Sequence, residues 1–398
     1  MLKSEILAAI EEMVLQNQNE LIQTRRVIHQ NPELSFKEIQ TSERIYNALQ
    51  EIPSLSVSRP TETSVLAVLK GGKEGKALAL RSDMDALAIQ EENQIDYQSL
   101  QPGVMHACGH DGHIAMLLSA AKILARFQSE IKGEIRFIFQ HAEEYHPGGA
   151  REIVRQGVLK GVDGIFAVHL WVPLSVGKIG IARGPLMAAP DNFDITILGK
   201  GGHAAMPQET IDPILVSAQV ITGLQALVSR MNNPLDPLVL SITGIHGGGT
   251  AYNVIPSQVD MKGTVRTFSR EKRREIPAVM EKMIAGVCSA YGAGYTFQYE
   301  LGYDPVINDD SFVSKISDIL LRTVGADALE TVSPVMGGED FSAYLQDVPG
   351  ALLFIGAGNA EKGIVNPHHH PRFNIDEESL VIGLRVLILT SMGFLDMI

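Results

Sequence analysis

The chain has 398 residues, a net charge of −13 from 33 basic and 46 acidic residues, and a hydrophobic content of 45%. This length predicts two or three folding units with a large core, and the ordinary hydrophobic content argues against disorder. Two cysteines cannot build a disulfide framework, and acidic charge spread along the chain, without a lysine or arginine run, argues against a nucleic-acid partner.

The first segment, 1–22, has the period of an amphipathic helix rather than the continuous apolar stretch of a signal peptide. Lys3, Glu5 and Glu11 interrupt its apolar residues. A run of about 18 uncharged apolar residues does not occur in the sequence, which therefore predicts no transmembrane helix. We expect a soluble, cytoplasmic protein without a membrane partner.

Between residues 75 and 180, short apolar runs alternate with helical stretches, which predicts a three-layer α/β unit. The predicted elements are strands at 77–80, 135–139 and 165–168 and a helix at 114–124. Five polar residues stand where these strands are predicted to stop: Asp83, Asp85, Glu143, Glu144 and His169. Because ligands of such sheets gather beyond the carboxyl ends of the strands, this edge is the candidate site.

After Pro185 the pattern changes to alternating strands, typical of a half-exposed sheet. The predicted elements are strands at 194–197, 238–242, 259–265 and 295–301 and helices at 213–231 and 275–291. They form a small α+β unit of roughly 110 residues, an ordinary domain size. We expect an inserted domain at 188–302 within a discontinuous domain of 1–187 and 303–398, which ends in a helix from about Glu377.

The densest polar segment is 105–113, which contains Cys108 and His110. In an extended segment, residues two apart face the same side, so these two are expected to approach one ion together. Thiolate and imidazole suit zinc and similar divalent metals. A buried cysteine beside helix-capping histidines, or a nucleophilic pair of Cys108 and His110, would also account for the segment.

Glu143 and Glu144 directly follow a predicted strand. Adjacent side chains on an extended backbone face opposite sides, so one carboxylate can bind a metal while the other takes a proton from a water. A solvated acidic turn is the alternative interpretation. His169 can be a ligand or a structural residue, and three consecutive histidines, 368–370, precede Pro371. Together these groups would fill two metal centres that share a water.

The order of several motifs resembles the co-catalytic metallopeptidase superfamily, in particular its aminoacylases, hippurate hydrolases and indole-acetyl-amino-acid hydrolases. The resemblance covers nearly the whole chain. Its motifs are VIHQNPELSF at 27–36, SDMDAL at 82–87, HACGHDGH at 106–113, AEE at 142–144, His169, GKGGHAAMP at 199–207, NVIP at 253–256, GTVR at 263–266, MGGEDF at 336–341 and the His-x-Pro element at His369. Each motif alone is weak, but their number and order are highly specific.

The chain departs from the family pattern at three places. Ala88 and His141 stand where the family usually has proline, and the usual Leu-His-Ser-Pro is replaced by His-His-His-Pro at 368–371. We assign His369 to the family's histidine because it keeps the spacing to the proline, although a neighbouring histidine could substitute. His106, His113 and His141 either support the ligands or are structural residues, and we favour the structural role.

The resemblance implies that five residues bind two divalent metal ions per subunit: Cys108, His110, Glu144, His169 and His369. It implies that Glu143 is the general base acting on a bridging water, and that Asp85 orients a ligand. His203 would stabilise the oxyanion, across a dimer interface or within one subunit, and Asn253 and Arg266 would hold the substrate. Zinc is the metal expected first, with manganese, cobalt or nickel as alternatives.

The implied fold is a three-layer α/β catalytic domain with a mixed, mostly parallel sheet and an inserted ferredoxin-like α+β lid or dimerisation domain. The implied reaction is hydrolysis of the amide bond of N-acyl-L-amino acids through a metal-activated water, in a homodimer or higher homo-oligomer. A dipeptidase, aminopeptidase or carboxypeptidase with the same site is the alternative activity. A more remote alternative is a non-catalytic protein that binds metal on the same scaffold. The motifs specify neither the acyl group nor the amino acid.

Overall fold

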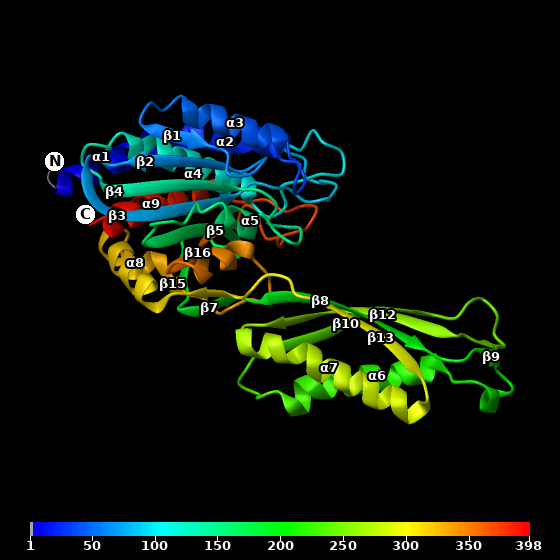
Figure 1. Cartoon of the computed structure of the whole chain (residues 1–398). Helices are drawn as coiled ribbons and strands as arrows, with labels where there is room; N and C mark the ends of the chain where they lie inside the picture. The colour runs from blue at the N-terminus through cyan, green and yellow to red at the C-terminus, as the bar shows by residue number, and fades with distance from the viewer. Residues whose placement is uncertain (1–2) are drawn as a thin grey trace. The chain divides into compact units, whose positions relative to one another are not determined.

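The computed structural model describes residues 3–398, and the chain divides into two compact units (Figure 1). The first unit comprises the described residues up to Leu186 together with Ile307–Pro334 and Asp340–Ile398. The second unit comprises Met187–Val306 and Val335–Glu339. Relative to the predicted insertion at 188–302, the second unit also includes Met187, the residues up to Val306 and the short stretch Val335–Glu339.

The first unit is built on an eight-stranded sheet in the order β1-β2-β4-β3-β5-β16-β6-β15, of which Figure 1 labels all strands but β6. The strands are β1 (Leu55–Ser58), β2 (Val65–Lys70), β3 (Lys73–Asp83), β4 (Lys132–Gln140), β5 (Gly164–Ser175), β6 (Ile179–Ile181), β15 (Leu329–Thr331) and β16 (Gly350–Gly358). The central strands β4, β3, β5 and β16 run parallel, whereas β2 is antiparallel to β4 and β6 is antiparallel to β16. The predicted α/β fold with a mixed, mostly parallel sheet is confirmed.

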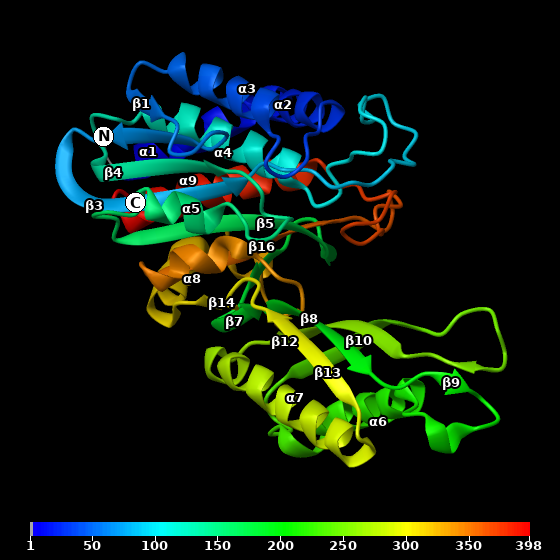
Figure 2. The same cartoon turned by 45° about the vertical axis from the view of Figure 1, so that its right-hand side comes forward.

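Helices cover both faces of this sheet. They are α1 (Lys3–Gln16), α2 (Gln18–Gln30), α3 (Ile39–Gln50), α4 (His110–Ala125), α5 (Ala150–Arg155), α8 (Asp310–Thr323) and α9 (Glu378–Phe394). Helices α4 and α9 pack against each other and the central strands, while α5 lies in front of the sheet in Figure 2. Gly383 allows the close approach of α9 to α4, because a Cβ there would lie 2.2 Å from the sulfur of Met116.

The predicted strands at 77–80 and 135–139 and the predicted helix at 114–124 are confirmed, each as part of a longer element. The prediction that the next strand ends before His169 is wrong. Strand β5 continues to Ser175 because it keeps pairing with β16, where Ile355 lies opposite Leu170. Its pairing with β3 ends at Ala167, so His169 projects from β5 just beyond the end of that neighbour.

The second unit is a four-stranded antiparallel sheet in the order β10-β12-β8-β13. Its elements are β8 (Ala189–Leu198), α6 (Pro213–Ala226), β10 (Leu238–Gly247), β12 (Gln258–Thr267), α7 (Arg270–Tyr291) and β13 (Gly294–Glu300), with a short ribbon of β9 (Gly202–His203) and β11 (Val254–Ile255). Side chains cap both helices: Asp212 accepts from the N–H of Ile214 at 2.9 Å, and Ser269 accepts from that of Lys272 at 3.2 Å. This βαββαβ order is ferredoxin-like.

One helical stretch of the described residues, Pro213–Met231, is long and apolar enough to cross a membrane by length and composition. Its buried residues include Val216, Val220 and Leu224, which belong to the core of the second unit. A helix that packs on the sheet of an α+β unit can have the same length and apolar composition. We therefore interpret the apolar side of this helix as a face buried in the core of the second unit.

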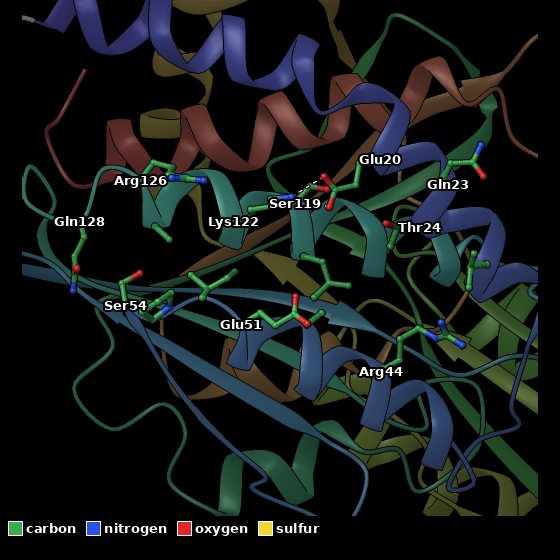
Figure 3. Close-up of a pocket in the computed structure, with 16 residues that line it drawn as sticks. Glu20, Gln23, Thr24, Arg44, Glu51, Ser54, Ser119, Lys122, Arg126 and Gln128 are labelled. Atoms are coloured by element: carbon green, nitrogen blue, oxygen red, sulfur yellow. Dashed lines mark hydrogen bonds and ion pairs between the residues drawn. The ribbon is translucent and has the colours of Figure 1, made fainter.

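A hollow of about 950 Å³ in the first unit is lined by residues of α2, α3 and α4 (Figure 3). Its rim includes Arg44 and Arg126, and Lys122 pairs there with Glu20 at 2.6 Å. Across residues 3–398, none of the predicted site residues lines this hollow. The candidate site is instead at the carboxyl ends of the central strands.

Candidate metal centre

The first two predicted ligands stand on a turn between a loop and a helix. Cys108 belongs to the loop, and His110 is the first residue of α4. Gly109 between them has a φ of +88°, a left-handed conformation that glycine adopts readily, and it turns the chain into the helix. The predicted extended geometry of this segment is therefore wrong, but the turn brings the two side chains together.

Five side chains of the first unit bring possible ligand atoms together: Cys108, His110, Glu144, His169 and His369. The atoms of Cys108, His110 and His169 lie within 4.8 Å of one another, and so do those of Cys108, Glu144 and His369. Cys108 Sγ is 3.8 Å from His169 Nε2, and Glu144 Oε1 is 3.2 Å from His369 Nε2. Because Cys108 belongs to both groups, its sulfur is placed to serve two ions.

Glu143 and Glu144 stand in a turn after β4, where Ala142 has a φ of +50°. The carboxylate of Asp85 holds this turn, since it accepts from the main-chain N–H groups of Glu143 at 3.0 Å and Glu144 at 2.9 Å. The possible ligand atoms of His110, Glu143 and Glu144 lie within 4.8 Å of one another, and Glu144 Oε1 is 3.8 Å from His110 Nε2. The expectation that they face opposite sides of an extended strand is wrong: they converge on one site.

Main-chain carbonyls fix the orientation of two of these histidines. His110 Nδ1 donates to the carbonyl of Asp85 at 2.9 Å. His169 Nδ1 donates to the carbonyl of Leu170 at 2.8 Å. Because a carbonyl oxygen only accepts, each ring holds a proton on Nδ1 and turns Nε2 toward the site, as metal-binding histidines generally do.

His113 also carries its proton on Nδ1, but its Nε2 already accepts a hydrogen bond from the main chain. Its Nε2 accepts from the N–H of Leu170 at 2.9 Å, so its Nδ1 holds a proton and donates to Asp83 at 2.6 Å. Neither nitrogen has a lone pair left for an ion, which fits the structural role predicted for His113. Asp83 also accepts from Arg81 at 2.7 Å. The sequence left Asp83 without a role, although its place in the SDMDAL motif two residues before Asp85 was a signal.

A buried ion network supports the start of α4. Arg25 donates to Asp111 at 2.7 Å, and His29 binds the same carboxylate oxygen at 2.8 Å and Glu91 at 3.2 Å. Removing one partner from such a buried ion pair lowers the free energy of unfolding by about 3–5 kcal/mol. This contact explains the conspicuous His29 of the first motif, which sequence reasoning did not connect with Asp111.

The donor set fits divalent metal ions. His110 Nε2 is buried and has no hydrogen-bond partner among residues 3–398, and such a group calls for an ion or ligand. Burial, and then the carboxylates of Glu144 and Glu143, raise the pKa of the Cys108 thiol well above its usual value. Burial acts to lower the pKa of His110, but Asp83 and Asp85 outweigh it and raise the pKa to about 10. Metal binding must therefore displace protons from the thiol and the ring.

The oxyanion group and one substrate-binding residue predicted from the sequence are neighbours in the second unit. The N–H of Ala204 donates to the carbonyl of Asn253 at 2.9 Å, which places His203 and Asn253 on one exposed ribbon. His203 Nδ1 accepts from the N–H of Ala205 at 3.1 Å. The ring proton is therefore on Nε2, where an exposed histidine can donate to an oxyanion.

The predicted carboxylate-binding residue, Arg266, lies half-buried on β12 of the second unit. Burial lowers the pKa of its guanidinium, and the nearby Asp191 offsets this effect only in part. Because Asp191 offsets the cost of burying this positive charge only in part, the guanidinium suits an anionic group of a ligand. It can bind such a group through two parallel N–H groups.

Comparisons with known proteins identify the family of this chain. The family described as peptidase family M20/M25/M40 matches residues 79–392. An N-acyl-L-amino acid amidohydrolase of Geobacillus stearothermophilus is 54% identical over 310 residues, 78% of this chain and 82% of the relative. Thermostable carboxypeptidase 2 of Saccharolobus solfataricus is 40% identical over 380 residues, 94% of this chain and 95% of the relative. Among solved structures, a dinuclear metal-binding peptidase of the M20 family from Bacillus subtilis has a TM-score of 0.83 at 37% identity and covers 96% of this chain and 99% of its own.

Proposed function

The chain belongs to peptidase family M20/M25/M40, and we propose that it hydrolyses the amide bond of N-acyl-L-amino acids with two divalent metal ions. One observation carries the proposal: Cys108 is shared by two groups of ligand atoms, and Glu143 lies with His110 and Glu144 beside them. The similarity to an N-acyl-L-amino acid amidohydrolase supports this substrate class.

Different residues of the chain have different roles in the proposed reaction. When bound, two divalent ions supply a water of lowered pKa and polarise the amide carbonyl. Glu143 takes the proton of the attacking water and returns it to the amine as the carbon–nitrogen bond breaks. His203 donates from Nε2 to the oxyanion, and Arg266 binds the carboxylate of the amino acid. The products are a carboxylic acid and a free amino acid.

A carboxypeptidase or dipeptidase is the second candidate function, because the same groups can attack a peptide bond. The similarity to thermostable carboxypeptidase 2 supports this second function. That relative is 40% identical to this chain, however, whereas the N-acyl-L-amino acid amidohydrolase is 54% identical. We therefore place acylated amino acids first.

Three finer features belong to the proposal. Zinc is proposed first because thiolate and imidazole are its common ligands, with manganese, cobalt and nickel as alternatives. We propose a homodimer or higher homo-oligomer. We also propose a cytoplasmic location, where a cysteine ligand such as Cys108 stays reduced.

The deciding experiment measures amine release from N-acetyl-, N-benzoyl- and indole-acetyl-amino acids beside simple dipeptides. Protein loaded separately with zinc, manganese, cobalt or nickel is assayed with each substrate. We expect acylated amino acids to be turned over fastest. Faster turnover of dipeptides would favour the peptidase, and no turnover by protein that holds two ions would overturn the proposal.

Replacing Arg266 by alanine is expected to raise KM for N-acyl-amino acids by about 10- to 100-fold, because a charge-assisted hydrogen bond contributes about 1.5–3 kcal/mol. Steady-state kinetics measure this effect. Lys262→Ala is the matched control, since it removes a positive charge from an exposed position on the same strand. The two variants should not differ on substrates whose carboxylate is replaced by a carboxamide. An unchanged KM in Arg266→Ala would remove Arg266 from the substrate site.

A further inference from the structure

A histidine that departs from the family's usual Leu-His-Ser-Pro pattern stands next to the predicted ligand His369. His368 occupies a position where the family usually has leucine. The hydrolysis that the family members have in common therefore does not explain an imidazole at this position. We propose that His368 is a positioning residue of the metal centre, which ties the loop carrying His369 to the strand carrying His169. This inference rests on the proposed metal centre and adds a residue that touches neither substrate nor ion.

The first contact of His368 is with the main chain of β5. Its Nε2 donates to the carbonyl of Leu170 at 2.9 Å. The same carbonyl accepts from His169 Nδ1 at 2.8 Å, and the N–H of Leu170 donates to His113 at 2.9 Å. The main-chain groups of one residue thus connect three histidines, and the hydrogen bond of His368 fixes its loop relative to the His169 ligand.

Aromatic rings hold His368 in this position. Its ring stacks on Trp171, with centroids 4.5 Å apart and an interplanar angle of 26°. Trp171 in turn stacks on Phe354, with centroids 4.3 Å apart and an angle of 6°. Phe373 lies 5.0 Å from the histidine ring. Since rotation of His368 away from Leu170 would break the stack, the packing and the hydrogen bond support each other.

His369 contacts Glu144 through its side chain, with Nε2 3.2 Å from Glu144 Oε1. Its side chain is 52% exposed, and its φ of +65° is uncommon for a residue with a Cβ. Its N–H donates to the carbonyl of Ala107 at 2.8 Å, directly before Cys108. The loop is therefore attached on one side to the residue before Cys108 and, through His368, on the other side to the residue after His169. Supporting contacts of this kind typically change metal affinity about 10- to 100-fold.

The test compares metal release from the wild-type, His368→Leu, His368→Gln and His370→Leu proteins. Leucine is the family's usual residue, and glutamine keeps an N–H near the position of Nε2. His370 is the matched control because its ring accepts only from the main-chain N–H of Arg372, at 3.0 Å, among the described residues. Each protein is loaded with zinc, its ion content is measured, and release to excess chelator is followed with time. Trp171, the single tryptophan, gives a fluorescence signal from the stack that is independent of activity.

We expect the wild-type and His370→Leu proteins to hold two ions and to release them at the same rates. His368→Leu should release one ion about 10- to 100-fold faster, with His368→Gln in between, and its Trp171 emission should change. Release from His368→Leu at the wild-type rates would overturn the proposal. A wild-type protein that does not hold two ions would instead overturn the proposed function. Should His368→Leu fail to fold by circular dichroism, His368→Gln is compared with His368→Asn, whose shorter side chain does not reach Leu170; equal release from both would overturn the proposal.

Discussion

Replacing Glu143 by alanine is expected to lower kcat by about 100- to 10,000-fold while the protein still binds two metal ions. The carboxylate is buried and lies within 4.8 Å of a ring nitrogen of His110 and of a carboxylate oxygen of Glu144. It belongs to neither of the two ligand groups that contain Cys108, so its loss should remove the proton acceptor and leave the ligands in place. Amine release and metal content, measured on the same preparation, check both parts.

Two further variants sharpen this result. Glu143→Gln keeps the shape of the side chain but cannot accept the proton, so it should be as inactive as the alanine variant. Glu152→Ala removes a carboxylate that pairs with His141 at 3.2 Å and should leave kcat unchanged. Loss of an ion from Glu143→Ala would identify Glu143 as a ligand, and a kcat close to that of the wild type would exclude it as the base.

Local pattern predicted most of the elements but not their limits. The apolar runs at 77–80 and 135–139 stand out because the central strands β3 and β4 are buried on both faces. The end of β5 could not be predicted in the same way. Beyond His169 the strand contains Pro173 and continues because of pairing with β16, whose residues come far later in the chain. A pairing of that kind leaves no periodic signal in the local sequence.

The identity of the candidate ligands was available from motifs, whereas their geometry was not. Both local expectations assumed extended backbone, but Gly109 at φ +88° and Ala142 at φ +50° turn the chain instead. The supporting contacts are remote as well: Arg81 binds Asp340 at 2.9 Å across 259 residues of sequence. His368 reaches Leu170 across 198 residues. The amino-acid sequence of a single chain does not indicate which residues so far apart come into contact.

Replacing Cys108 by alanine is expected to abolish the binding of both metal ions, because its sulfur is the one atom shared by the two ligand groups. Each of the other four ligands belongs to only one of the two groups that contain Cys108. Metal content after dialysis measures the effect, and amine release should fall to the background rate with every metal. Cys288→Ala is the matched control, since this cysteine is buried in the core of the second unit and should not affect metal content.

The pH dependence of binding separates a shared thiolate from a merely structural cysteine. Burial raises the pKa of the Cys108 thiol, and Asp83 and Asp85 raise that of His110 to about 10 against the opposing effect of burial, so both groups are protonated at neutral pH without metal. Binding must release both protons, and metal affinity should therefore rise with pH and fall on acidification. In Cys108→Ser, which has no thiol proton to lose, the plot of affinity against pH should be shallower by about one proton, and the affinity itself should drop. Wild-type affinity and slope in that variant would show that the sulfur binds neither ion.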